Sequence, residues 1–560
     1  MLIRAPQKFF NARFPQGPRL SVPIGLLAIA SFLESREVQV QIFDAFVEGE
    51  QYHQIVEQGV LSKAPDKATE NMLHFGASWD EVTQAISDYR PDIIGISAIF
   101  DETTEETLQA AKIARAVMPG ALIIIGGPSA STHPDSFLEQ CPEIDLVCRG
   151  DGEETTLELV EWLQGKRPIE MVSSVVYRQE KANKCTAPRS LPQELDHLGQ
   201  LNYELVKLER YFKLEQRGIM SRQRFSYPGS HRAITVITSR GCPYACSFCS
   251  VHIHAGKKYR TFSPEHVLDH LETLVRKYGI NHIHFEDDNL TLDRKRFMKL
   301  AAGILERDLK FTWDTPNGVH ANTLSRDMMV EMKKTGCVYL IVAVESGDQW
   351  VIDEVINKKP MTIEHVLDAF SVGKEIGLDL QAFYVIGFPR EKMKNIMTTL
   401  KFAMNGLVKW DVTPHVNIAM AYAGTDLYQE SLTTGVLTGD DKERKSALGI
   451  RISDSRHMIT TREFTPESML KLNEKYHRKF VMVLFFKMLK FGLFHPLLLL
   501  RNLSYFREIK HQLGGNFKET AMQLFFARLL YPNALIREST FSSKSRELRA
   551  SSNQGSGLAP

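Results

Sequence analysis

Two long runs of alternating strand and helix patterns constrain the fold of this chain more than any other feature. In the first run, residues 1–180, buried strand patterns at 92–97 and 121–125 follow amphipathic helical patterns at 79–89 and 105–117. Such alternation is typical of a parallel sheet with helices on both faces. We therefore predict an α/β domain with a doubly wound, Rossmann-like sheet over residues 1–180.

The second run covers residues 232–430 and repeats this alternation. Its strand patterns lie at 233–238, 280–285, 310–313, 338–344, 380–386 and about 412–420. Most of them end in polar or glycine-containing stretches, as the active-site end of a parallel barrel requires. This predicts a partial (β/α)6 TIM-like barrel, joined to the first domain by an irregular linker at 181–231.

The chain beyond residue 430 follows neither pattern, and we predict a helical region at 431–540 and a Ser-rich, disordered tail at 541–560. Residues 461–560 carry 16 Lys and Arg against 7 Asp and Glu, although the whole chain has a net charge of only +1. An apolar stretch at 480–500 is interrupted by Lys487, Lys490 and Pro496, which argues against a spanning helix. Two interpretations stay open: a helical cap over the barrel mouth, and an interfacial helix or lid for a lipid-like substrate.

Three of the seven cysteines, Cys242, Cys246 and Cys249, lie within eight residues and are spaced C-x3-C-x2-C. Closely spaced thiolates hold iron–sulfur clusters. Three of them bind three irons of a [4Fe-4S] cluster and leave the fourth iron open for a small molecule. A structural zinc site, with His252 or His254 as the fourth ligand, is the alternative. A disulfide is disfavoured because three cysteines leave one odd and the first residues show no secretory pattern.

With Phe248 directly before the third cysteine, the motif resembles the signature of the radical S-adenosylmethionine (SAM) enzymes. The resemblance implies that the amino and carboxylate groups of SAM chelate the open iron. An electron then cleaves SAM to methionine and a 5′-deoxyadenosyl radical, which abstracts hydrogen from an unreactive C–H bond. The protein positions and shields this chemistry.

The resemblance extends to the strand ends of the second run. The acidic residues 286–288 fall where the family carries a Gly-Gly-Glu motif, and we expect Asp287 to hold the ammonium group of SAM. Glu345 and Ser346 fall where relatives contact the ribose or carboxylate, and Gly387 where they pack the adenine. The residues expected to contact SAM are Phe248, Glu286, Asp287, Glu345, Ser346 and Gly387.

The first run resembles the cobalamin-binding domain that precedes the barrel in one branch of this family. The residues expected to contact cobalamin are Ser97, Gly126, Gly127, Ser129, Gly150 and Glu153. One motif of such domains, D-x-H-x-x-G, is absent, because no His follows the first strand until His53. The resemblance therefore implies cobalamin without a protein His on cobalt, and a degenerate domain without cofactor is the open alternative.

The combination of these domains predicts a cobalamin-dependent radical SAM methyltransferase that acts on an unactivated carbon of a small or lipid-like substrate. A radical SAM cyclase or rearranging enzyme without methyl transfer, and a zinc-bearing module that is not an enzyme, are the alternatives. An electron donor such as flavodoxin or ferredoxin is the expected partner, and the low net charge argues against nucleic acid. Scattered cysteines predict a reducing, cytoplasmic location, with peripheral binding to the inner face of a membrane left open.

Overall fold

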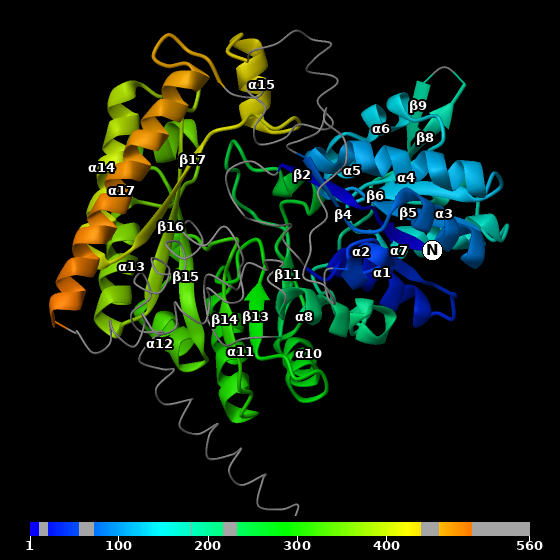
Figure 1. Ribbon diagram of the computed structural model, residues 1–560, viewed down its shortest axis with the longest axis horizontal. Helices are drawn as coiled ribbons and strands as arrows, with labels where there is room; N and C mark the ends of the chain where they lie inside the picture. The colour runs from blue at the N-terminus through cyan, green and yellow to red at the C-terminus, as the bar shows by residue number, and fades with distance from the viewer. Residues whose placement is uncertain (11–20, 55–71, 181, 217–231, 438–458, 495–560) are drawn as a thin grey trace, which may run out of the picture.

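The computed structural model describes residues 1–10, 21–54, 72–180, 182–216, 232–437 and 459–494. A mostly parallel and a fully parallel sheet, each covered by helices, lie side by side, with the mostly parallel N-terminal sheet to the right and the barrel to the left in Figure 1. The remaining residues, which include the predicted disordered tail at 541–560 and most of the predicted helical region, lie outside the described part.

The N-terminal sheet has seven strands in the order β3-β1-β5-β6-β7-β8-β9. The first five pair in parallel, and β8 and β9 add an antiparallel hairpin. The order reverses between β1 and β5, which is the switch point beside which doubly wound sheets bind ligands. The strands are β1 (Leu2–Arg4), β3 (Ile42–Asp44), β5 (Ile93–Ser97), β6 (Leu122–Gly126), β7 (Leu146–Cys148), β8 (Val175–Gln179) and β9 (Ala182–Cys185).

Helices cover both faces of this sheet, so the predicted doubly wound fold is confirmed. One core joins Ile94, Ile123 and Ile125 to α3 and α4, and the opposite face packs on α1 and α7. An antiparallel pair, β2 (Gln7–Phe10) and β4 (Met72–Phe75), was not predicted. The helices are α1 (Ile24–Glu34), α2 (Gly49–His53), α3 (Trp79–Tyr89), α4 (Thr104–Val117), α5 (Pro128–Thr132), α6 (Pro134–Gln140) and α7 (Glu153–Leu163).

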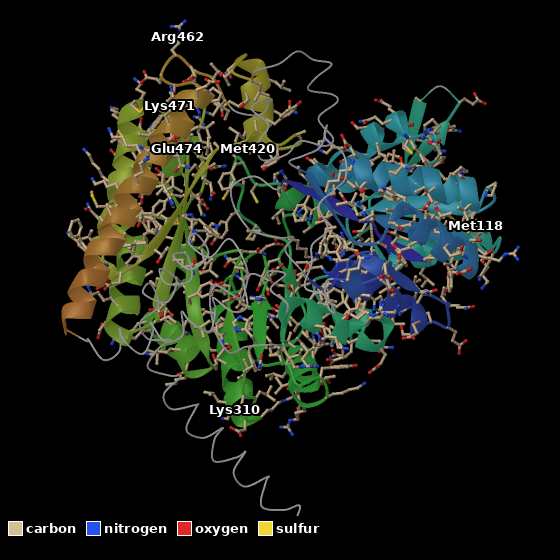
Figure 2. All side chains as sticks on the ribbon, viewed as in Figure 1. Met118, Lys310, Met420, Arg462, Lys471 and Glu474 are labelled. Atoms are coloured by element: carbon tan, nitrogen blue, oxygen red, sulfur yellow. The ribbon has the colours of Figure 1, made fainter. Side chains whose placement is uncertain are left out.

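The second sheet has six parallel strands in chain order, β10-β13-β14-β15-β16-β17. Their bounds are β10 (Ala233–Val236), β13 (His282–Phe285), β14 (Thr312–Asp314), β15 (Cys337–Glu345), β16 (Asp379–Ile386) and β17 (Thr413–Ile418). Because β10 and β17 are edge strands, the barrel is partial, as predicted. Lys310, before β14, and Met420, after β17, mark its two ends in Figure 2.

Five long helices cover the outer face of the barrel, on which residues such as Leu340, Val342 and Val344 of β15 are buried. They are α10 (Pro264–Arg276), α11 (Arg294–Glu306), α12 (Arg326–Lys334), α13 (Ile363–Ile376) and α14 (Met393–Trp410). The last of these is not among the predicted helices. Ser263 caps α10 by accepting a hydrogen bond from the His266 amide, as its position predicts.

Helix α8 (Leu208–Gln216) and the turns before it pack between the two domains. The Tyr211 hydroxyl donates to Asp44 at the end of β3, and Asp44 also pairs with the buried Arg4. Tyr203 reaches the other domain, where its hydroxyl lies 3.0 Å from Nε2 of His270 on α10. The described residues 203–216 of the connecting segment therefore pack against both domains.

Helix α17 (Pro466–Phe494) runs along α14 on the outer side of the barrel, where Figure 2 labels Lys471 and Glu474. Leu484 is buried against Met404 and Leu407, and the Lys487 ammonium pairs with Asp411. The start of the helix approaches the barrel mouth, with Met469 3.4 Å from a Cβ placed on Gly387. Among the described residues, no helix combines the length and apolar character needed to cross a bilayer.

Candidate active site

The three motif cysteines lie on one loop between β11 (Ser239–Arg240) and α9 (Val251–His254), next to the carboxyl end of β10. All three are free thiols, and Cys246 is buried. Gly241 gives the loop its entry turn. Its φ is +84°, and a Cβ there would lie 2.4 Å from the carbonyl oxygen of Lys258. Only glycine fits this position without strain, because both the backbone conformation and the space exclude a side chain.

The surroundings of the three thiols suit a charged cluster. Burial raises the pKa of Cys242 to about 11 and that of Cys246 to about 12, and it also raises the pKa of Cys249. The negative charge of Cys249 adds to the shift of the other two, so the thiols lie within electrostatic reach of one another. Thiolates there need a bound cation to offset their burial, and the irons of a [4Fe-4S] cluster supply that charge.

A mononuclear zinc ion fits these residues less well. Tetrahedral zinc with bonds of about 2.3 Å to sulfur needs donor atoms about 3.8 Å apart. In the described part of the chain, no three donor atoms drawn from the motif thiols, His252 and His254 all lie within 4.8 Å of one another. A cluster in which each iron takes one thiolate allows this wider spacing. The residues present therefore fit a [4Fe-4S] cluster.

The cysteine loop is fastened to the barrel at several points. The Ser247 amide donates to the carbonyl of Ile356 at 2.8 Å, and its hydroxyl donates to that of Val355 at 3.0 Å. Tyr244 stacks on His320 with ring centroids 3.9 Å apart. Phe248, predicted to border SAM, lies 5.9 Å from the ring of Phe388. These contacts hold the cysteines at the mouth of the barrel.

The acidic residues after β13 divide into two environments. The buried Asp287 carboxylate accepts hydrogen bonds from the Thr238 amide and hydroxyl and from the Ser239 hydroxyl. Asp288 instead accepts from the Gly241 amide at 2.8 Å, and burial raises its pKa to about 6. Asp287 thus fastens the end of β10, whereas Asp288 faces the cysteine loop. Glu286 is half-buried beside them.

The end of β15 carries a buried ion pair that sequence reasoning did not find. Glu345, in a left-handed backbone conformation with φ +64°, accepts a hydrogen bond of 2.6 Å from the ammonium of Lys358. Lys358 is 2% exposed, and its charge offsets part of the rise that burial causes in the pKa of all three motif thiols. A lysine at this distance from the motif has no signal in a single sequence.

The other two predicted SAM contacts lie at adjacent strand ends. The Ser346 hydroxyl is buried and hydrogen-bonded to that of Thr399 at 2.8 Å. Gly387 has φ +93°, and its amide donates at 2.6 Å to Glu391. The amide of Phe388 donates to the same oxygen at 2.9 Å. The Glu391 carboxylate therefore shapes the turn that follows β16.

Most of the predicted cobalamin contacts gather at the carboxyl edge of the N-terminal sheet. Ser97 and Gly126 end the paired strands β5 and β6. Gly127 has φ +111°, and a Cβ there would lie 2.6 Å from the carbonyl oxygen of Ala98, so only glycine fits this position. Ser129 is buried and its hydroxyl donates to Asp101, which also lies 3.3 Å from a ring nitrogen of His133.

This edge also exposes apolar side chains that sequence reasoning did not single out. Ile99 and Phe100 follow β5 and are 37% and 62% exposed. An exposed apolar platform beside glycine turns fits the flat, largely apolar face of a corrin ring. The residues present therefore fit cobalamin.

The remaining two predicted cobalamin residues, Gly150 and Glu153, face the barrel. The buried Glu153 pairs with Arg240 at 2.6 Å, and Arg240 directly precedes the glycine of the cysteine loop. Asp151 pairs with Arg240 at 3.3 Å and with the fully buried Arg260. A Cβ on Gly150 would lie 3.6 Å from the carbonyl oxygen of His254. The carboxyl edges of the two sheets are thereby joined through this loop.

Two family models match the chain. The model of the radical SAM superfamily matches residues 236–403, and that of the B12 binding domain matches residues 20–160. The two matches cover the cysteine loop and the carboxyl edge of the N-terminal sheet.

Among curated relatives, an uncharacterized methyltransferase of Pyrococcus horikoshii is 29% identical, over 72% of this chain and 81% of the relative. Cytidylyl-2-hydroxyethylphosphonate methyltransferase of Streptomyces wedmorensis is also 29% identical, over 66% and 70%. An anaerobic magnesium-protoporphyrin IX monomethyl ester cyclase of Rubrivivax gelatinosus is 25% identical, over 72% of each chain.

Two solved structures share the fold. The radical SAM methyltransferase TsrM of Kitasatospora setae superposes with a TM-score of 0.59 at 15% identity, covering 78% of this chain and 77% of TsrM. The cobalamin-dependent radical SAM enzyme OxsB superposes with a TM-score of 0.59 at 17% identity, covering 100% and 81%. At these identities the likeness is one of fold, and it extends over both sheets of the chain.

Proposed function

Because this chain belongs to the cobalamin-binding branch of the radical SAM enzymes, we propose that it transfers a methyl group from SAM to an unactivated carbon of a small molecule. Both of the methyltransferase relatives described above support this reaction. When bound, the cluster supplies an electron that cleaves SAM to a carbon radical, and cobalamin supplies a carrier for the methyl group. The protein must therefore hold two cofactors close to one substrate.

Different residues of the chain bind the cluster and SAM. Cys242, Cys246 and Cys249 hold the cluster. We assign the ammonium of SAM to the acidic residues 286–288, and within them to Asp288 rather than Asp287, because Asp287 already accepts from Thr238 and Ser239. Lys358, which carries a positive charge near the thiols, suits the carboxylate of SAM. The remaining predicted SAM and cobalamin contacts stay predictions.

The observation that carries the proposal is the joining of the two carboxyl edges. Arg240, next to the cysteine loop, pairs with Glu153 at the edge of the cobalamin-type sheet. A methyl group must pass between two cofactors across this junction, and transfer demands that the reacting groups be held in near-attack geometry. A rigid ion pair between the loops that carry the cofactors meets that demand.

The test is anaerobic reconstitution of the full chain with iron, sulfide and cobalamin, followed by incubation with methyl-deuterated SAM and metabolite extracts. We expect S-adenosylhomocysteine, 5′-deoxyadenosine and a product that has gained a CD3 group. A Cys249→Ala variant is the control that should form none of these. Formation of 5′-deoxyadenosine without S-adenosylhomocysteine or deuterated product would rule out methyl transfer.

That last outcome would favour a second candidate, a radical SAM cyclase without methyl transfer. The similarity to the anaerobic cyclase of Rubrivivax gelatinosus supports it. Product mass separates the two reactions, because cyclisation removes hydrogens whereas methylation adds a CH2 unit. The relevant readout is a mass decrease in the same extract assay.

The inner face of the barrel supports a polar class of substrate. His415 and Asn417 of β17 are exposed there, on the strand face opposite Val416, and His415 is hydrogen-bonded to Gln381. Such groups favour a small molecule with polar substituents over a lipid. Binding to anionic vesicles would instead support the lipid-like substrate and the peripheral membrane association predicted from the basic C-terminal region.

The proposed reaction also requires an electron-donor protein and a reducing compartment. The cluster needs a single-electron donor such as flavodoxin or ferredoxin, and reduction of the purified protein by such a donor tests this. The seven cysteines are all thiols rather than disulfides, including the exposed Cys185, which suits the cytoplasm.

A further inference from the structure

The inner face of the barrel holds a group of metal-ligating side chains that the radical SAM site does not use. His282 and His284 lie on the same face of β13, because the intervening Ile283 packs outward into the helix-covered core. Asp314 on β14 is in register with His284. The two neighbouring strands thus direct two imidazoles and one carboxylate to one point.

The geometry of the three side chains is compact. His284 Nδ1 lies 2.7 Å from Asp314 Oδ1, and His282 Nε2 lies 3.2 Å from Asp314 Oδ2. One ligand atom from each residue lies within 4.8 Å of the other two. His282 and Asp314 have no exposed surface, and His284 is 5% exposed. Polar groups buried this deeply have either a structural partner or a ligand.

Thr312 orients the first histidine. Its hydroxyl lies 2.7 Å from His282 Nδ1 and donates to the Asn281 carbonyl at 3.3 Å. When the hydroxyl makes that donation, its oxygen accepts from the Nδ1–H of His282. In that tautomer the Nε2 lone pair faces Asp314 Oδ2 at 3.2 Å, an arrangement that either a proton or a metal ion can bridge. A histidine that donates outward through its other nitrogen is the usual arrangement of a metal ligand.

We propose that His282, His284 and Asp314 bind one divalent first-row transition-metal ion, Zn²⁺ or Fe²⁺, in the barrel interior. Two imidazoles and one carboxylate are the ligand set that these ions prefer, and three protein ligands leave at least one coordination position for water or a substrate oxygen. The site contains no thiolate and lies within strands, so it is separate from the cysteine loop.

Such an ion would link β13 to β14 on the inner face. The chain leaves β13 directly into residues 286–288, which include Asp288 beside Gly241. The ion would therefore stiffen the strand whose end carries the proposed SAM contact. This stiffening of β13 does not depend on whether the enzyme methylates or cyclises its substrate.

The test uses the full-length, cluster-containing protein. After anaerobic treatment with a chelator, Zn²⁺ or Fe²⁺ alone is added, and metal content and thermal unfolding are measured. We expect one equivalent of metal beyond the cluster iron, and a rise in the unfolding temperature of several degrees. Mössbauer spectra separate a mononuclear Fe²⁺ from the cluster. No additional metal, or no change in unfolding temperature, would overturn the proposal.

Two variants locate the site. His282→Gln and Asp314→Asn should each lose the additional equivalent while keeping the visible absorbance of the cluster. His415→Gln, which changes another inner-face histidine outside the group, should keep it. Retention of the additional metal by both ligand variants would place it elsewhere and refute the assignment. Should one variant fail to fold, the other locates the site, and the wild-type titration still decides whether an additional metal binds.

Discussion

The guanidinium of Arg240 and the carboxylate of Glu153 lie 2.6 Å apart and link two domains whose contacting residues are 87 positions apart in the chain. Glu153 is buried, so the pair is shielded from water and salt. It connects the edge of the cobalamin-type sheet to the residue before the cysteine loop. This contact therefore contributes, with the Asp151–Arg260 pair, to the relative position of the two cofactor sites.

Replacing Arg240 by Ala is expected to reduce methyl transfer more than SAM cleavage. The change leaves the Glu153 carboxylate buried without this partner, at a cost of about 3–5 kcal/mol, and loosens the junction between the domains. The ratio of S-adenosylhomocysteine to 5′-deoxyadenosine measures the effect. Arg232→Ala, which removes a more exposed ion pair with Glu209, is the matched control and should leave this ratio unchanged. An equal loss of both products would contradict a positioning role.

Replacing any of the three motif cysteines by Ala is expected to abolish the cluster. The wild-type protein should carry about four irons per chain after reconstitution, and each variant less than about one. Iron analysis and visible absorbance check this. Cys185→Ala is the control, because that thiol is exposed on β9 of the other domain. Full iron content in a Cys246→Ala protein would show that the cluster is held elsewhere.

Replacing Gly241 by Ala is expected to destabilise the cysteine loop. The new Cβ would lie 2.4 Å from a backbone oxygen that cannot move freely, and the positive φ adds strain of about 1–3 kcal/mol. Reduced iron content and a lower unfolding temperature are the measurements. Gly120→Ala is the control, since nothing lies within 4 Å of its Cβ position. Equal behaviour of the two variants would remove the case for a required glycine.

Breaking the Glu345–Lys358 pair from one side is expected to cost more than removing both charges. Lys358→Met leaves a buried carboxylate beside the thiols, which costs about 3–5 kcal/mol. The double variant that combines Glu345→Gln with Lys358→Met removes both charges, so it should be the more stable of the two. Thermal unfolding of the two proteins under anaerobic conditions measures the difference. A double variant less stable than the single one would be inconsistent with this account.

The Glu391 carboxyl is expected to make stability fall as pH rises through the acidic range. Burial raises its pKa from an ordinary 4.5 to about 7. The folded protein therefore binds this proton more tightly than the unfolded chain, and the contribution is lost between about pH 4.5 and about pH 7.

The Glu391→Gln variant should lack this loss, so its stability relative to wild type should rise across that window by up to about 3 kcal/mol. Denaturant unfolding of both proteins, at about pH 4.5 and at about pH 8, measures the change. A stability difference between variant and wild type that stays constant over this range would refute the assignment.

Local sequence patterns determined where many of the helices and strands lie. Helices such as α3 and α7 begin and end at the predicted residues, because amphipathic spacing and flanking residues are properties of neighbouring positions. The cysteine motif is also local: its spacing predicted three cluster ligands with zinc as the alternative, and its resemblance to a known signature implied the SAM chemistry. Helix α14 was not predicted, although its sequence is amphipathic and its buried residues recur at helical spacing.

Tertiary structure decided how these parts meet. Asp287 and Asp288 are adjacent and identical in the sequence. In the fold, Asp287 bonds to Thr238, whereas Asp288 bonds to the cysteine loop. The partners Glu153 and Arg240, and likewise His284 and Asp314, belong to separate strands and loops. Their approach depends on sheet register and domain docking, which arise from the burial of entire faces and leave no periodic signal near either residue.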